Sequence, residues 1–161
     1  MNPNFVLLVV GGLCIGIVAG MRALTAPAVT SWAVRLGWLD LTGFHFARFG
    51  TTVTAVVLSL LALLELINDK RPTAPNRTAP LGFGARLFTG TLSAIVIFAS
   101  AHQSLLLGAL LGAIGATIGT FGGFHIRRYL TKNKGLPDLY VALAEDFVAV
   151  GGGLLLVSHL F

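Results

Sequence analysis

The sequence predicts an all-α integral membrane protein with about five transmembrane helices, in a single domain spanning residues 1–161. Hydrophobic residues make up 55% of the chain and charged residues only 11%, whereas soluble domains carry about a quarter charged residues. The mean hydropathy is +0.87. The apolar runs are continuous and do not alternate every second residue, which favours membrane helices over a transmembrane barrel.

The first predicted span, residues 5–34, is longer than the roughly 20 apolar residues that a membrane helix needs. Gly20, Arg22 and Pro27 lie in its middle. A proline removes a backbone donor and clashes with the preceding turn, so we expect a helix break between Gly20 and Pro27. The segment then consists of a spanning half and a tilted or interfacial half.

The remaining predicted spans are residues 51–68, 86–101, 105–130 and 139–160. Prolines between residues 72 and 80 predict a loop over residues 70–84, between the second and third spans. The fourth span is long and glycine-rich, and we expect it to break at Gly119, Gly122 and Gly123.

The distribution of basic residues predicts an orientation in the bilayer. Loops 69–86 and 127–138 fall on the same side of a five-span protein, and each contains four Lys or Arg residues. The positive-inside rule makes that side cytoplasmic, with the N-terminus cytoplasmic and the C-terminus outside. A re-entrant first segment would change the number of spans and this orientation.

The first and fourth segments also resemble each other at a constant offset. Gly16, Ala19, Gly20 and Pro27 correspond to Gly112, Gly115, Ala116 and Gly123. Two interrupted hydrophobic segments in corresponding halves indicate an inverted-repeat transporter, with its site where the helices break. Inversion requires the two segments to point in opposite directions, as a five-span arrangement gives. A second similarity, residues 62–65 with 142–145, fits less well because both of its acids lie near cytoplasmic helix ends.

Acidic residues inside the membrane are the first candidates for chemistry. They are Glu65, Asp69, Glu145 and Asp146. A carboxylate at the bilayer centre costs at least ~2.5 kcal/mol, so such acids face the protein interior or water. We predict that these four handle coupling protons. The alternative is that Glu65 and Glu145 pair with basic residues and hold the bundle together.

Basic residues near the predicted breaks are the candidates for receiving an anionic substrate. They are Arg22, Lys70 and Arg86. Arg22 lies beside Gly20, where an opened backbone would add N–H donors to a phosphate or carboxylate site. Alternatively, Arg22 only neutralises Glu65 or Glu145. At the end of the fourth span, His125, Arg127 and Arg128 are interpreted chiefly as anchors against lipid headgroups, with a contribution to phosphate binding as the alternative.

Other features exclude several classes of function. No serine–histidine–acid arrangement or His-Glu-x-x-His spacing occurs, so we expect neither an enzyme nor a bound cofactor. The net charge of +5 lies mostly in two short loops and does not indicate nucleic-acid binding. Glycine pairs at i, i+4, such as Gly16 with Gly20, allow close helix contacts within the monomer or across a homodimer.

Four motifs occur in order over most of the chain. They are Gly20-Met21-Arg22-Ala23 with Pro27, Glu65 with Asp69-Lys70-Arg71-Pro72, Arg86 with Gly90, and Ala144-Glu145-Asp146. In these motifs the chain resembles the bacterial membrane proteins grouped as domain-of-unknown-function family 4126. The family also has a His and basic residues after the fourth span, similar to His125, Arg127 and Arg128 but at another spacing. The resemblance implies a multi-pass protein of the bacterial inner membrane and supplies no activity.

The sequence therefore predicts a small secondary transporter or lipid-carrier translocase, proton-coupled, for an anionic substrate, with membrane lipids as its partners. Two alternatives stay open. A cavity lined by the four carboxylates would bind a divalent cation through oxygen ligands. A scaffold or assembly factor would use the same charges only to hold its helices together.

Overall fold

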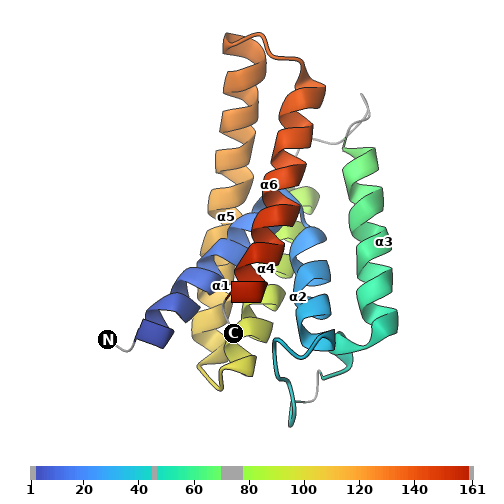
Figure 1. The fold of residues 1–161 in the computed structure, drawn as a ribbon. Coiled ribbons are helices and arrows are strands. Elements are labelled where there is room, and N and C mark those ends of the chain that lie inside the picture. The colour runs from blue at the N-terminus through green and yellow to red at the C-terminus, as the bar shows by residue number, and fades with distance from the viewer. Residues whose placement is uncertain (1–2, 45–46, 70–77, 160–161) are drawn as a thin grey trace.

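A computed structural model describes residues 3–44, 47–69 and 78–159. Every regular element in these ranges is helical. The elements are α1 (Pro3–Met21), α2 (Thr25–Arg35), the 3₁₀ helix η1 (Ala47–Gly50), α3 (Thr52–Asn68), α4 (Pro80–Ser100), α5 (Leu105–Arg128), the π-helical turn η2 (Tyr129–Asn133) and α6 (Asp138–His159) (Figure 1).

Three of the described helices are long and apolar enough to cross a membrane: Pro80–Ser100, Leu105–Asn133 and Asp138–His159. Two apolar helices are shorter, Phe5–Met21 and Thr52–Asn68. The chain is thus an all-helical membrane protein, as the composition predicts. The number of spans stays a prediction.

The first apolar segment does break, between Met21 and Thr25, which lies inside the predicted interval. The break reverses the chain. Arg22 contacts Asp146, and Val29 packs against Gly153, so α2 runs in the same direction as α6. At its other end α2 meets the start of α3, where the Arg35 side chain donates to the Thr52 hydroxyl at 2.8 Å. The second half of the segment, predicted to be tilted or interfacial, is therefore the returning arm of a helical hairpin.

Close contacts between α1 and α5 show that these two helices run parallel. A Cβ on Gly16 would lie 3.0 Å from the Gly115 Cα, and a Cβ on Gly20 would lie 2.8 Å from the Gly119 Cα. The predicted inversion of these two segments is wrong, because the reversal after Met21 adds a change of direction. The predicted sides of the two ends of the chain stay a prediction, because the number of spans does. The start of α1 and the end of α6 lie at the same end of the bundle.

Two boundary predictions are also wrong. The third apolar helix begins at Pro80, not at residue 86, because a proline is well tolerated at the first helical position, where its missing N–H is not needed. The fourth segment has no break at Gly119, Gly122 or Gly123: α5 is continuous over 24 residues. Its glycines let the backbones of α5 and α1 approach each other, since Gly119 packs directly against the backbone of Ile17 and Gly20.

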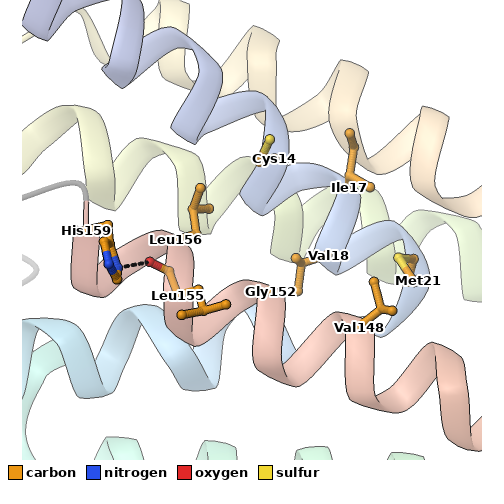
Figure 2. A pocket seen from close by; sticks show the side chains of 9 residues that line it. All are labelled: Cys14, Ile17, Val18, Met21, Val148, Gly152, Leu155, Leu156 and His159. Atoms are coloured by element: carbon orange, nitrogen blue, oxygen red, sulfur yellow. Dashed lines mark hydrogen bonds between the residues drawn. The ribbon is translucent and has the colours of Figure 1, made fainter.

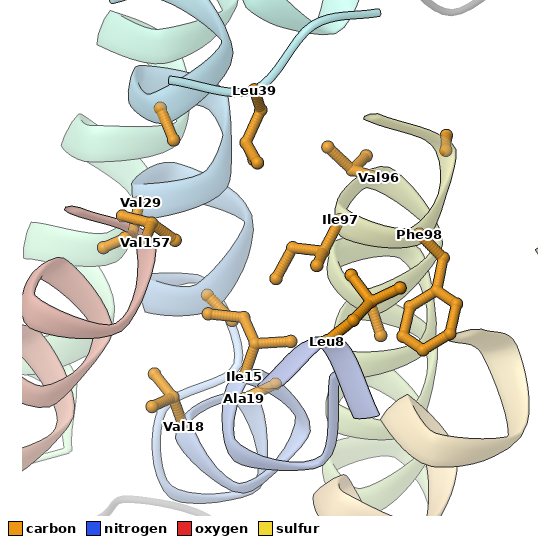
Figure 3. Close-up of a cluster of buried hydrophobic side chains, with 14 of the residues drawn as sticks. Leu8, Ile15, Val18, Ala19, Val29, Leu39, Val96, Ile97, Phe98 and Val157 are labelled. Atoms are coloured by element: carbon orange, nitrogen blue, oxygen red, sulfur yellow. The ribbon is translucent and has the colours of Figure 1, made fainter. Parts of the chain in front are cut away.

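The apolar core fills the end of the bundle opposite the α5–α6 connection. Ile15, Ile97 and Phe98 are fully buried there, and Val157 of α6 joins them (Figure 3). Leu39, in the connection after α2, is 1% exposed and covers the core. Arg22, Asp69 and Asp146 lie at the other end, where α1 breaks, α3 ends and α6 begins, whereas Arg35, Asp40 and Arg48 lie at the core end.

Candidate functional site

Arg22 is the centre of a buried cluster of charges. It follows α1 directly, and its side chain is 0% exposed. One terminal nitrogen lies 2.6 Å from the Oδ2 of Asp69, at the end of α3. The other lies 2.6 Å from the Oδ1 of Asp146, in the third turn of α6. One guanidinium thus joins the helix break to two helices far apart in sequence.

Arg127, near the end of α5, extends the cluster. Its NH1 nitrogen lies 2.9 Å from the Asp69 Oδ2 that Arg22 also contacts. Its Nε and NH2 atoms donate to the two carboxylate oxygens of Asp138 at 2.8 and 2.7 Å, a bidentate geometry that strengthens such pairs. The Glu145 carboxylate is 3.9 Å away. We call these six residues the ion-pair network: Arg22, Asp69, Arg127, Asp138, Glu145 and Asp146.

Glu65 lies beside the network and binds the break itself. Its two carboxylate oxygens accept hydrogen bonds from the backbone N–H groups of Ala23 and Leu24, both at 2.8 Å. Leu24, which precedes α2, has no side-chain cap of its own. The first N–H groups of a helix lack partners within it, and a carboxylate at this end also interacts favourably with the helix dipole. Glu65 therefore fixes the point at which the chain reverses.

The predicted acids all lie at this end of the molecule. Asp69 and Asp146 meet at Arg22, Glu145 approaches Arg127, and Glu65 holds the break. Arg22 is neutralised by carboxylates, although its partners are Asp69 and Asp146 and not the expected Glu65 or Glu145.

The structure says less about the other two predicted substrate-binding residues. Arg86 is buried in α4, one turn before Gly90 and 7% exposed. Lys70 lies outside the described residues. The predicted break residues Gly20 and Pro27 flank the actual break: Gly20 packs on α5, and Pro27 belongs to the first turn of α2.

Sequence reasoning missed Arg127 and Asp138. Arg127 is interpreted there as a headgroup anchor, and Asp138 only as a loop residue. One signal was present: the two residues end and begin consecutive helices joined by a short connection, which brings them together. Within the described ranges, no group of three or more His, Cys, Asp or Glu side chains is arranged to hold a metal ion. The divalent-cation alternative thus finds no ligand set in that part of the chain.

An apolar groove begins at the network. One cavity of about 370 Å³ lies between α5 and α6 and has Ile17 and Met21 of α1 as its floor. A second, more open one of about 560 Å³ continues between α1 and α6 as far as His159 (Figure 2). Ile17, Met21 and Val148 line both, so we treat them as one groove. Its charged lining residues are Arg127 and Glu145, at the network end.

Fold and site together define a small helical membrane protein with a buried ion-pair network next to an apolar groove. The family model for a domain of unknown function, DUF4126, matches residues 9–159. The chain belongs to this family, as its motifs predict. Neither the curated proteins nor the solved structures include a match to it.

Proposed function

We propose that the protein is a small proton-coupled carrier, a secondary transporter or lipid-carrier translocase, for an anionic substrate. The observation that carries the proposal is the ion-pair network at the helix break. Charged groups inside a membrane protein are expensive to keep and commonly mark substrate or proton pathways. Here they join α1, α3, α5 and α6 where the chain reverses, so a change in protonation would act on four helices together.

The coupling step follows from the sharing of Asp69. Its Oδ2 contacts both Arg22 and Arg127. A proton taken up by Asp69 would weaken both contacts at once and leave the NH1 nitrogen of each guanidinium group for an anionic group, while the pairs with Asp146 and Asp138 hold the two side chains in place. Release of the proton would restore the closed network. This exchange requires substrate and proton to move in a fixed relation, as coupled carriers do.

The proposed placement has the network on the cytoplasmic side of a bacterial inner membrane. The basic residues that precede α6 support this side under the positive-inside rule. Because the start of α1 and the end of α6 share the opposite end, both termini are then outside.

Reconstituted vesicles test the proposal. A fluorescently labelled anionic lipid is followed by quenching of the outer leaflet, with and without a pH gradient. We expect the gradient to accelerate exchange by the unmodified protein and to lose that effect in Asp69→Asn, as in Glu65→Gln and Glu145→Gln. Asp40→Asn is the control, because Asp40 is an exposed acid outside the network. An unchanged response to the pH gradient in Asp69→Asn would contradict the coupling step.

The closed pairing of Arg22 favours a second candidate, a non-transporting scaffold or assembly factor. With both terminal nitrogens against carboxylates and no side-chain exposure, the network needs no function beyond holding helices together. In that case Glu65→Gln lowers stability without changing any flux, and a partner protein co-purifies with the unmodified chain.

A further inference from the structure

We infer that the groove along α6 binds a phosphate-bearing amphiphile with one long apolar chain, with its headgroup beside Arg127 and its chain running toward His159. This inference deepens the proposed function by naming the substrate class, and it rests on that proposal. It stands on three features of the groove: its length, its charge at one end, and the glycines that leave it open.

The groove is longer than one leaflet of the bilayer is thick. Its α6 wall extends from Val141 to His159. At about 1.5 Å per residue these eighteen steps span roughly 27 Å, close to the ~30 Å thickness of the hydrocarbon core. The acyl tails of an ordinary lipid occupy one leaflet, about half of that thickness. A polyprenyl chain that extends through both leaflets fits the whole groove.

The charge at the network end complements a phosphate. Arg127 and Arg128 end α5, and the connection to α6 adds Lys132 and Lys134. Arg127 is paired with Asp138 and Asp69, and Glu145 lines the groove beside it, so the excess of positive charge comes from the residues that follow Arg127. Arg128, Lys132 and Lys134 are exposed, and the side chain of Arg127 is 16% exposed. Basic residues in this position attract anionic headgroups. Between Arg127 and Glu145 at the network end and His159 at the far end, the side chains that line the groove are apolar.

Two glycines keep the groove open, because they have no side chains. Gly122 of α5 lines the part next to the network, and Gly152 of α6 lines the distant part. An added Cβ at either position would meet no atom within 4 Å, so the space at each is unfilled by the protein itself. Gly151 is equally free of neighbours but does not line the groove. The pair Gly151 and Gly152 is therefore a matched control built into one helix.

Ligand binding to the full chain in detergent tests the inference without any transport. The probes are a long-chain polyprenyl monophosphate, a short-chain one, the uncharged long-chain polyprenol and dioleoyl phosphatidic acid, each measured by native mass spectrometry. We expect the long-chain phosphate to bind about tenfold more tightly than each of the others. Gly152→Leu should remove the advantage of the long chain and leave short-chain binding unchanged, and Gly151→Leu should alter neither.

The other outcomes overturn the inference. Equal binding of phosphatidic acid means that ordinary bilayer lipid fills the groove, and equal binding of polyprenol means that the phosphate is not recognised. A dimer that Gly152→Leu dissociates means that a second copy covers it. Absence of binding, or equal effects of the two glycine variants, also contradicts it. If the long-chain phosphate binds as expected but no vesicle assay detects movement, the proposed function fails and the binding site stands.

Discussion

The NH1 nitrogen of Arg22, at the helix break, lies 2.6 Å from the Oδ2 of Asp69. The NH1 nitrogen of Arg127 lies 2.9 Å from the same Asp69 oxygen. The three residues come from the end of α1, the end of α3 and the end of α5. A single carboxylate thus ties together three helix ends that are separated by dozens of residues along the chain. Removing either partner of the Arg22 pair leaves a buried charge without its main compensation.

We therefore expect Arg22→Met to lower the free energy of unfolding by about 3–5 kcal/mol, the usual cost of breaking a buried ion pair from one side. The measurement is an unfolding titration in mixed detergent micelles. Arg48→Met, at an exposed site in η1, is the control and should change stability by no more than about 0.5 kcal/mol. The double variant Arg22→Met/Asp146→Asn should recover part of the loss. A stability of Arg22→Met equal to that of the unmodified protein contradicts this account of the network.

Glu65→Gln should loosen the break without unfolding the bundle. The carboxylate binds two backbone N–H groups, one through each oxygen. Glutamine offers only one oxygen acceptor, so one of the two N–H groups loses its partner, at a cost of about 1–3 kcal/mol. Hydrogen–deuterium exchange should accelerate at Ala23 or Leu24. Glu145→Gln should leave exchange at these two amides unchanged, and an equal acceleration in both variants would count against a specific role for Glu65.

Gly20→Val should disrupt the contact between α1 and α5. A Cβ there would lie 2.6 Å from the Thr120 backbone nitrogen, closer than side-chain carbons approach, and the obstacle is backbone that cannot rotate away. We expect a loss of more than about 3 kcal/mol, seen as a lower unfolding temperature in detergent. Gly151→Val should be close to neutral, because no atom lies within 4 Å of the added carbon. Similar melting of the two variants would mean that α1 and α5 are not packed through Gly20.

Cysteines introduced at the start of α1 and at the end of α6 should be labelled from the same side of the membrane. In a Cys14→Ser background, single cysteines at Asn4 and His159 should react with an impermeant maleimide from one side, and a cysteine at Lys134 from the other. The parallel arrangement of α1 and α5 requires this result, whereas the five-span arrangement puts Asn4 and His159 on opposite sides. Labelling of Asn4 together with Lys134 contradicts the helical hairpin of α1 and α2.

Sequence reasoning located the charged end of the molecule because charges in an apolar chain need a physical reason. Glu65, Asp69, Glu145, Asp146 and Arg22 were all singled out, and the break near Arg22 followed from Pro27. The direction of α2 was not predictable, because it depends on long-range contacts: Glu65 at its start and the beginning of α3 at its end. That reversal in turn decides the relation between α1 and α5.

The roles of the glycines in α5 were also not predictable from the sequence alone. In sequence, a glycine that breaks a helix and a glycine that lets two helices touch look alike. Gly119 meets the backbone of α1, whereas Gly122 faces open space in the groove, and only the position of α1 distinguishes them. Arg127 was undervalued for a related reason, since its partner Asp69 is 58 residues away in sequence.

Coupling between the movement of an anionic amphiphile and protons through the ion-pair network can be measured in a single preparation. The most direct measurement follows both in the same vesicles, with a labelled polyprenyl monophosphate in the membrane and a pH-sensitive dye in the lumen. Substrate movement and a change of lumenal pH should occur together in a fixed ratio, and Asp69→Asn should abolish the pH change. Substrate movement without any proton movement in the unmodified protein would contradict it.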